Sequence, residues 1–311
     1  MHLLVTWQDL SDKDLQQIEE KTGATILKGF TEEEAREYAP QADVILGGFG
    51  AASVLEAAVK CRWMQTPFAG VESILAAKWG NPEMILTNGR GSFGPNISEH
   101  VLGLILSFNR GLHLARDQQN QRVWQPRLSI PFRELTGSTV GILGFGDIGR
   151  HVAKRLAPFD CKVEGFRQHP SEGVHGLDEF DSFLPSLDYL VCALPETSKT
   201  IGFLHKDRLR LLPKQAIVVN VGRGSLIPTD DLILALEEKW ISGAALDVTS
   251  PEPLPKESPL WTMPNVIITP HNSGFTAHLK KRSLQTFFAN WQHFIETGQP
   301  QINLVSASLG Y

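Results

Sequence analysis

The sequence predicts an α/β protein built from two doubly wound parallel-sheet domains. Two series of apolar runs of strand length, one in the first hundred residues and one beginning at Thr139, alternate with stretches that have helical character. Runs that are apolar throughout are typical of strands buried on both faces of a parallel sheet. At 311 residues the chain is long enough for two cores, because a single core rarely exceeds about 250–300 residues.

The first series predicts strands at residues 2–7 and 42–48, and a strand, a loop and a helix within residues 62–80. Residues 12–23 predict a helix that Gly23 closes, and residues 53–61 predict another. Strands that alternate with helices in this way indicate a parallel sheet.

Two longer helices are predicted outside these series. Residues 98–119 form a long, almost wholly apolar stretch with too many polar interruptions for a membrane span, so we expect one helix buried between domains or subunits. Residues 275–298 predict a final helix. A tail of this length makes no domain by itself, and we expect it to pack onto the first half of the chain.

The second series contains six apolar runs that predict six strands of one sheet. These runs are TVGILGFG, KVEGFR, YLVCALP, AIVVNVG, AALDV and VIITPH.

A glycine-rich turn follows the first of these runs. Gly144, Gly146 and Gly149 form GxGxxG between a predicted strand and a predicted helix, the context that makes this common pattern informative. Glycines let the backbone approach a pyrophosphate, and the first amides of the helix, at Asp147 and Ile148, face the anion. The pattern therefore predicts a Rossmann-like dinucleotide site.

The end of the next strand bears on the choice of cofactor. An NAD site presents an acid there to the ribose hydroxyl, whereas this chain has Arg167. Glu164 comes three residues earlier and points to the other face of an alternating strand. A guanidinium suits a 2′-phosphate, so we expect NADP(H), with NAD(H) possible. The alternative is that Arg167 only stacks on the adenine.

Reactive side chains follow the last three predicted strands. Arg223 lies between two glycines after one strand, Asp247 ends the next, and His271 follows the third. Glu252 lies in a proline-rich loop five residues after Asp247. Ligands bind at the carboxyl ends of strands in open parallel sheets, so we expect these groups at one rim.

In these motifs the sequence resembles the D-2-hydroxyacid dehydrogenase family, with glyoxylate/hydroxypyruvate reductases as the nearest kind. The matching segments are GSTVGILGFGDIG, CALPETSKT, VVNVGRGSLI, GAALDVTSPEPLP and NVIITPHNSGFT, in family order. QTPFAGVESI is similar to the family's Gly-Val-Asp loop, with Glu72 where Asp is usual.

The resemblance implies a catalytic set of Arg223, Glu252 and His271. Arg223 would bind the carboxylate and carbonyl oxygen of a 2-oxo acid, which form a planar pair suited to a guanidinium. His271 would donate a proton to that oxygen in reduction and take it back in oxidation. Glu252 would hold the imidazolium, and the cofactor would carry the hydride.

The resemblance also implies binding residues. For the cofactor these are Gly144, Gly146, Asp147, Ile148, Gly149, Arg167, Leu194, Pro195, Thr200, Val221, Gly222, Asp247 and His271. For the substrate they are Ala69, Gly70, Val71, Arg223 and His271. Asn88, Arg90 and Phe93 lie at the expected hinge without an assigned role, and His100, His113 and His205 are interpreted as structural.

The family's domains are not consecutive in the chain. The resemblance implies a discontinuous substrate domain at residues 1–98 and 281–311 and a dinucleotide domain at residues 99–280. It also implies a homodimer that uses the helix predicted from Ser98.

Composition narrows the partners and the compartment. A net charge of −5 without a long basic run argues against nucleic acid or a membrane surface. The three cysteines lack metal-site spacing, so we expect no metal and reduced thiols. Without a signal-like N-terminus, the expected location is cytoplasmic.

The expected reaction is reduction of glyoxylate or hydroxypyruvate. Alternatives within the family are a 3-phosphoglycerate-type dehydrogenase without a regulatory domain, and an enzyme acting on phosphite or formate. A different class of function is a nucleotide-sensing, corepressor-like binding protein. The complete set of Arg223, Glu252 and His271 favours the enzyme.

Overall fold

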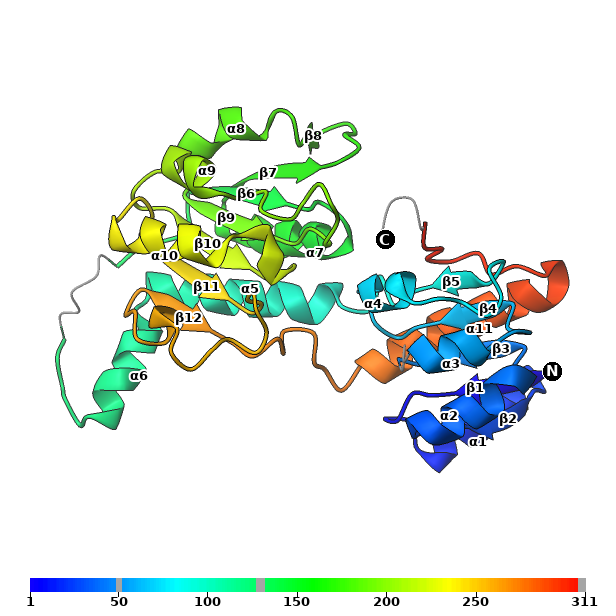
Figure 1. The fold of residues 1–311 in the computed structure, drawn as a ribbon. Coiled ribbons are helices and arrows are strands. Elements are labelled where there is room, and N and C mark those ends of the chain that lie inside the picture. The colour runs from blue at the N-terminus through cyan, green and yellow to red at the C-terminus, as the bar shows by residue number, and fades with distance from the viewer. Residues whose placement is uncertain (49–51, 127–131, 307–311) are drawn as a thin grey trace. The chain divides into compact units, whose positions relative to one another are not determined.

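Two parallel sheets, one of five strands and one of seven, organise the chain (Figure 1). The structure is a computed structural model and describes residues 1–48, 52–126 and 132–306. Unit 1 comprises Met1–Phe93 and the chain from Thr276 on, and unit 2 comprises Gly94–Phe275. The predicted fold class is confirmed, because both sheets are parallel throughout and each is covered by helices. The predicted domain ranges extend to residue 311, so residues 307–311 lie outside the described chain.

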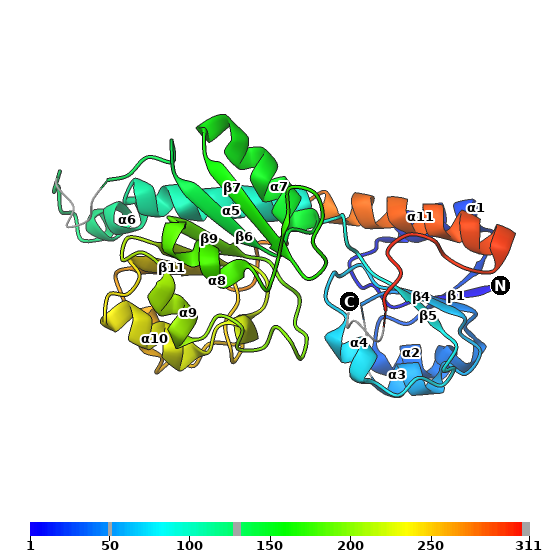
Figure 2. The same ribbon diagram turned by 90° about the horizontal axis from the view of Figure 1, so that it is seen from above.

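Unit 1 has the strand order β2-β1-β3-β4-β5, the order of flavodoxin-like sheets. Its strands are β1 (His2–Val5), β2 (Thr25–Lys28), β3 (Val44–Leu46), β4 (Trp63–Gln65) and β5 (Ile85–Thr87). Its helices are α1 (Asp12–Thr22), α2 (Glu32–Tyr38), α3 (Ala52–Ala57), α4 (Glu72–Ala76) and α11 (Leu279–Thr297). Figure 2 shows α1 and α11 on one side of this sheet and α2, α3 and α4 on the other.

The last helix, α11, completes the core of unit 1. Its Phe287 ring stacks on Trp63 of β4, with centroids 5.4 Å apart, and Phe294 lies 5.2 Å from the same indole. Trp63 and Phe287 are fully buried, and burial of aromatic side chains contributes strongly to core stability. The segment from the C-terminal part of the chain therefore forms one of the two layers on the first sheet.

Local sequence signals set the helix ends in unit 1. Ser11 and Asp14 form a reciprocal capping box at the start of α1, and Gly23 ends this helix at a φ of 64°. Thr31 and Glu34 form the same arrangement at α2. In each box a side chain satisfies a backbone N–H that the helix leaves without an acceptor.

Unit 2 has the strand order β12-β11-β10-β9-β6-β7-β8. This is the doubly wound order of dinucleotide-binding sheets with one further strand, and the order reverses between β6 and β9. Its strands are β6 (Thr139–Leu143), β7 (Lys162–Arg167), β8 (His175–Gly176), β9 (Tyr189–Cys192), β10 (Ile217–Asn220), β11 (Gly243–Leu246) and β12 (Val266–Ile268).

Helices cover both faces of the second sheet (Figure 2). The helices of unit 2 are α5 (Gly94–Asn109), α6 (Leu112–Asn120), α7 (Asp147–Leu156), α8 (Phe180–Phe183), α9 (Lys206–Leu211) and α10 (Thr229–Glu237). Helices α5 and α7 pack together on one face. Residues of α8, α9 and α10 close a large apolar core on the other face.

The single helix predicted over residues 98–119 is wrong in two respects. The helix α5 begins earlier, at Gly94, and ends at Asn109. Gly111 then adopts a φ of 61°, and a separate helix α6 follows, without any buried residue. A left-handed residue cannot continue a right-handed helix, so the apolar pattern conceals a break.

Candidate active site

The GxGxxG residues form the turn between β6 and α7. Gly144 adopts a φ of 106°, and a Cβ atom there would lie 2.6 Å from the carbonyl of Ala193. A Cβ on Gly149 would lie 2.5 Å from the Gly144 carbonyl oxygen. These two glycines therefore let the turn close against the end of β9 and let the helix pack on the turn.

Gly146 has a different environment from the other two glycines. A Cβ atom there would meet no heavy atom within 4 Å. Gly146 is also the N-cap of α7 and makes no side-chain cap hydrogen bond. The first N–H groups of a helix have no acceptor within the helix, so those at Asp147 and Ile148 lie beside open space at its positive end. A pyrophosphate fits this turn.

Arg167 is the last residue of β7 and is half-buried. Its Nε donates to the carbonyl of His169 two residues later. Glu164, on the same strand, pairs with Lys162 at 2.9 Å and with His175 at 3.0 Å. Burial opposes ionisation, but these hydrogen bonds outweigh it and lower the pKa of Glu164. The Glu164 carboxylate is therefore already hydrogen-bonded to side chains of β7 and β8.

Leu194, Pro195 and Thr200 belong to the loop that follows β9. Leu194 is buried, and Pro195 is half-buried. The Thr200 hydroxyl is also buried in this loop, where it donates to the Pro195 carbonyl at 2.7 Å and accepts from the Thr197 amide at 2.8 Å. Thr200 thus fixes the conformation of the loop.

Arg223 follows β10 and is positioned by a buried asparagine. Asn220 donates from Nδ2 to the Arg223 carbonyl at 2.9 Å and accepts from the Gly222 amide at 3.1 Å. Val221 is buried beside them. A Cβ on Gly222 would lie 2.7 Å from the Leu194 carbonyl oxygen, so this turn packs directly against the β9 loop.

Glu252 and His271 are in hydrogen-bond contact at this rim. His271 Nδ1 lies 2.8 Å from Glu252 Oε2, and Glu252 Oε1 accepts from the Thr249 amide at 2.9 Å. The side chain of His271 is 51% exposed. Since Nδ1 contacts the carboxylate, Nε2 is the ring nitrogen available to a ligand.

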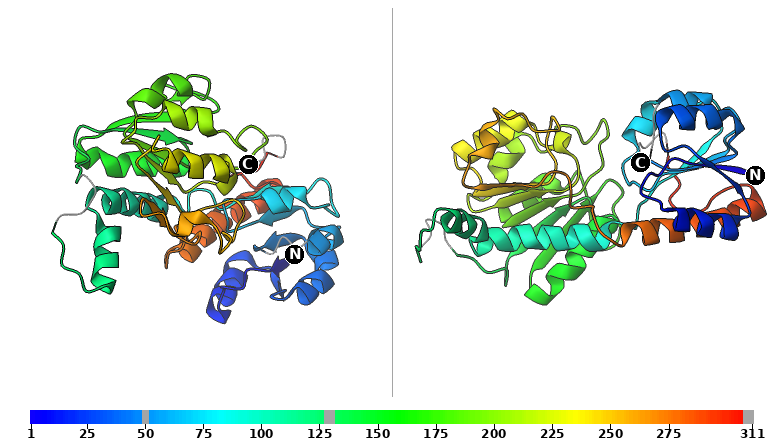
Figure 3. Two further views of the ribbon diagram at one scale, coloured as in Figure 1. Left: turned by 60° about the vertical axis from the view of Figure 1, so that its left-hand side comes forward. Right: turned by 90° about the horizontal axis from the view of Figure 1, so that it is seen from below.

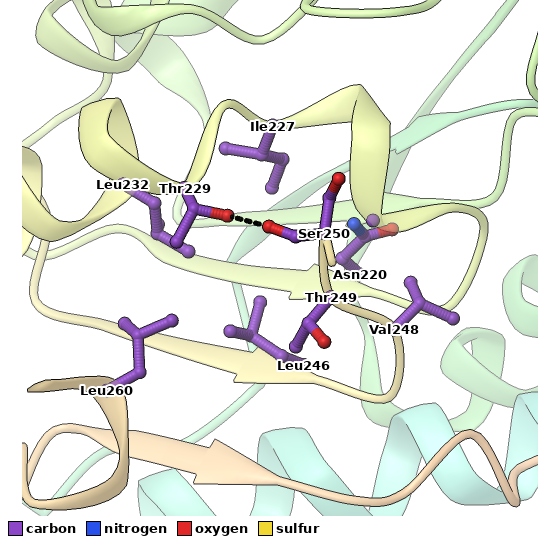
Figure 4. A pocket seen from close by; sticks show the side chains of 10 residues that line it. Asn220, Ile227, Thr229, Leu232, Leu246, Val248, Thr249, Ser250 and Leu260 are labelled. Carbon is purple, nitrogen blue, oxygen red and sulfur yellow. Dashed lines mark hydrogen bonds between the residues drawn. The ribbon is translucent and has the colours of Figure 1, made fainter. Parts of the chain in front are cut away.

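A small cavity lies behind these loops, between β10, β11 and α10 (Figure 4). Its lining includes Ile227, Leu232, Leu246 and Leu260. The Thr229 hydroxyl donates across it to the Ser250 carbonyl at 2.6 Å, next to the loop with Glu252 (Figure 4). The mainly apolar lining indicates a support for the rim rather than a ligand site.

Asp247 directly follows β11 and is 2% exposed. Its carboxylate accepts from the Thr269 hydroxyl at 2.6 Å, from the amides of Asn272 and Ser273, and from the Ser273 hydroxyl. Among the cofactor residues that the resemblance implies, Asp247 is the one expected to contact the cofactor's carboxamide. Such a contact would have to share an oxygen with the bonds that hold the segment around His271.

In unit 1 the predicted substrate loop follows β4. Ala69 and Gly70 are accessible, whereas Val71 is buried at the start of α4. Asn88 is buried and donates from Nδ2 to the Ala69 carbonyl at 2.9 Å. Asn88 thus holds this loop through its side chain.

The remaining hinge residues are tied to the same region of unit 1. The Arg90 amide donates to Asn88 Oδ1 at 3.2 Å, and Phe93 is buried.

The structure brings the predicted groups of unit 2 to the carboxyl ends of β6, β7, β9, β10, β11 and β12. Asn96 and Thr269 were not predicted as site residues from the sequence, and His100 was interpreted as structural. All three contact the segment that contains His271 or the carboxylate of Asp247. The signal available was the four-residue spacing of Asn96 and His100 on a helix that is mainly apolar after His100.

No cluster of at least three His, Cys, Asp or Glu side chains in residues 1–48, 52–126 and 132–306 is arranged to hold a metal ion. Over the same ranges, every helix is too short or too polar to span a bilayer.

Comparison with known proteins identifies relatives of this chain. The family model described as D-isomer specific 2-hydroxyacid dehydrogenase, NAD binding domain, matches residues 102–273. The chain is also 32% identical over 258 residues to an uncharacterized protein in the proB 3′ region of Corynebacterium melassecola. That match covers 80% of this chain and 84% of the relative.

Solved structures give the same result over nearly the whole chain. A D-isomer specific 2-hydroxyacid dehydrogenase family protein from Aeromonas salmonicida is 36% identical, with a TM-score of 0.86 and coverage of 98% of this chain and 99% of that one. An enzyme of this description from Xanthobacter autotrophicus, in complex with NADPH, is 27% identical with a TM-score of 0.84 and coverage of 100% and 99%. The NADPH-dependent glyoxylate/hydroxypyruvate reductase of Sinorhizobium meliloti, in complex with NADP and sulfate, is 25% identical with a TM-score of 0.82 and coverage of 100% and 99%.

Alanine at Gly144 should mainly lower the stability of the protein, whereas alanine at Gly146 should mainly weaken NADPH binding. Gly144→Ala lowers the free energy of unfolding by about 1–3 kcal/mol, because alanine is strained at positive φ. Gly146→Ala changes it by less than about 0.5 kcal/mol but weakens NADPH binding on the order of tenfold, since its methyl group enters the open space. Urea denaturation and calorimetric titration measure the two effects. Unchanged NADPH affinity in Gly146→Ala would contradict the turn as the anion site.

Proposed function

Because the chain belongs to the D-isomer specific 2-hydroxyacid dehydrogenase family, and is therefore an NAD(P)-dependent oxidoreductase, we propose that it reduces short 2-oxo acids with NADPH. Glyoxylate and hydroxypyruvate are the proposed substrates. The observation that supports this proposal most directly is the 2.8 Å contact between His271 Nδ1 and Glu252, at the same sheet edge as Arg223.

The three side chains have distinct tasks in the proposed reaction. Arg223 binds the carboxylate and the carbonyl oxygen of the 2-oxo acid and polarises the carbonyl. His271 donates a proton from Nε2 to that oxygen during reduction and accepts it back during oxidation. Glu252 orients the ring through Nδ1 and stabilises its protonated form. The nicotinamide cofactor, when bound, supplies the hydride.

The proposed cofactor residues follow the carboxyl ends of β6 and β9, where the strand order reverses, and of the neighbouring strands β10 and β11. The amides at Gly146, Asp147 and Ile148 would bind the pyrophosphate, with Gly144 and Gly149 shaping the turn. The loop after β9, with Leu194, Pro195 and Thr200, and the turn after β10, with Val221 and Gly222, would line the nicotinamide half. Asp247 remains the proposed partner of the carboxamide, through an oxygen shared with its protein contacts.

The preference for NADP(H) rests on the end of β7. Arg167 offers a planar donor to a 2′-phosphate. Glu164 is committed to Lys162 and His175, so its carboxylate is unavailable to a ribose 2′-hydroxyl. The NADPH and NADP bound to the relatives from Xanthobacter and Sinorhizobium support the same preference.

The choice of substrate rests on the loop after β4 and on a relative. The backbone amides of Ala69, Gly70 and Val71 would bind a substrate carboxylate, and Asn88 holds this loop. The Sinorhizobium relative is described as a glyoxylate/hydroxypyruvate reductase, which supports these acids here.

We also propose that the protein is a homodimer through α5 and α6. The helix α6 stands away from the sheet of unit 2 (Figure 3) and buries none of its residues. Leu112 is 55% exposed, and Trp124, just after the helix, is 94% exposed. Exposed apolar side chains gathered in one region mark an interaction surface, and a second copy of the chain is the proposed occupant.

Arg167→Ala should affect the two cofactors differently. It raises the KM for NADPH on the order of 10- to 100-fold, the equivalent of one lost charged hydrogen bond, and leaves the KM for NADH nearly unchanged. Lys154→Ala, at an exposed position of α7, is the control and alters neither value. A wild-type preference for NADH, or an equal rise for both cofactors in Arg167→Ala, argues against recognition of the phosphate.

Variants of the catalytic set should separate chemistry from binding. His271→Asn lowers kcat by about 10²–10⁴-fold with NADPH affinity nearly intact, and Arg223→Ala raises KM and lowers kcat. NADPH oxidation with glyoxylate, hydroxypyruvate, pyruvate and phenylpyruvate measures both effects, and His205→Asn is the control. Tight NADPH binding without oxidation by any of these acids would point instead to a nucleotide-sensing protein.

The dimer is tested by light scattering after size-exclusion chromatography at micromolar concentration. The wild type should show twice the 34.4 kDa mass of one chain. Leu112→Asp shifts the mass towards the monomer, whereas Leu211→Asp, at an exposed position of α9, does not. A monomeric wild type refutes the proposed interface.

A further inference from the structure

The segment that contains His271 is bound on one side by helix α5. Asn96 and His100 are four residues apart and so lie on the same face of this helix. Asn96 donates from Nδ2 to the Ser273 carbonyl at 2.8 Å, and His100 Nε2 lies 3.1 Å from the Thr269 hydroxyl oxygen. These two contacts lie on either side of His271 in the sequence.

The direction of the second contact follows from the hydrogens available. The Thr269 hydroxyl donates its single hydrogen to Asp247 Oδ1 at 2.6 Å, because an ionised carboxylate is an acceptor only. Thr269 must then accept from His100, so His100 has its proton on Nε2. A directed chain runs from His100 through Thr269 to Asp247, whose Oδ1 also lies 3.8 Å from His100 Nε2.

Asp247 accepts the hydrogen bonds that fix the backbone of the segment around His271. Besides Thr269, its carboxylate accepts from the amides of Asn272 and Ser273, and its backbone carbonyl accepts from the His271 amide at 2.8 Å. His271 adopts a φ of 50°, a region that costs a non-glycine residue free energy unless surrounding contacts enforce it. The network around Asp247 supplies these contacts.

We propose that Asn96 and His100 are positioning residues for His271, acting through Ser273, Thr269 and Asp247. This inference rests on the proposed function, because it takes His271 as the proton donor. The backbone of His271 is held from the side of α5, and its ring is held by Glu252 at 2.8 Å. A proton donor needs a hydrogen-bond distance to the reacting oxygen, so both supports set the geometry of proton transfer.

Two pairs of substitutions test the chain of contacts. His100→Phe keeps an aromatic ring but removes the donor, whereas His100→Gln keeps an N–H group near the position of Nε2. Thr269→Val removes the hydroxyl without changing the shape, and Thr269→Ser retains it. His205→Phe, at an accessible position outside this network, is the control.

His100→Phe and Thr269→Val should each lower kcat on the order of 10- to 100-fold through misplacement of the donor, and should lower NADPH affinity far less than kcat. His100→Gln and Thr269→Ser should retain most of the turnover. Because both residues act through one chain, the double variant should lose little more than either single variant. Multiplied losses in the double variant, or full activity in His100→Phe, would overturn the proposal.

Hydrogen exchange of the backbone amides tests the same network without turnover. The amides of His271, Asn272 and Ser273 are bound to Asp247, and in His100→Phe they should exchange faster than in the wild type and in His100→Gln. Unchanged exchange with reduced turnover would mean that His100 acts by another route, and would refute positioning. If the wild type reduces no 2-oxo acid, the proposed function fails, while the exchange rates still decide whether α5 holds the segment.

Discussion

The register of three adjacent parallel strands in unit 2 determines the arrangement of its polar rim. Asn220 of β10 pairs with Leu246 of β11, which in turn pairs with Ile268 of β12. Parallel strands in register end at the same level, so the residues that follow them emerge side by side. Groups that are some fifty residues apart in the chain thereby become neighbours. The loops after these strands then determine which atoms meet.

Much of this arrangement was predictable from hydrophobic pattern. The six apolar runs after Thr139 coincide with β6, β7, β9, β10, β11 and β12, because strands buried on both faces must be apolar throughout. The glycine turn was predictable for the same kind of reason. At Gly144 the backbone conformation and the approach of Ala193 both exclude a side chain.

Other features left little trace in the sequence. The edge strands β2 and β8 are short and only partly buried, so they lack the apolar signal of central strands. The break after α5 depends on one backbone angle at Gly111, and glycine occurs inside helices as well as after them. The contacts of Asn96 and His100 join residues about 170 positions apart. A polar side chain on a helix does not indicate which distant segment it contacts.

The left-handed backbone at position 271 also narrows which amino acids can occupy it. Branched side chains are strongly disfavoured at this φ, whereas glycine, asparagine, aspartate and histidine tolerate it best. Within that short set, only an imidazole readily gains and loses a proton around neutrality. Steric tolerance and acid–base chemistry thus select the same residue by independent routes, which makes histidine doubly constrained at the end of β12.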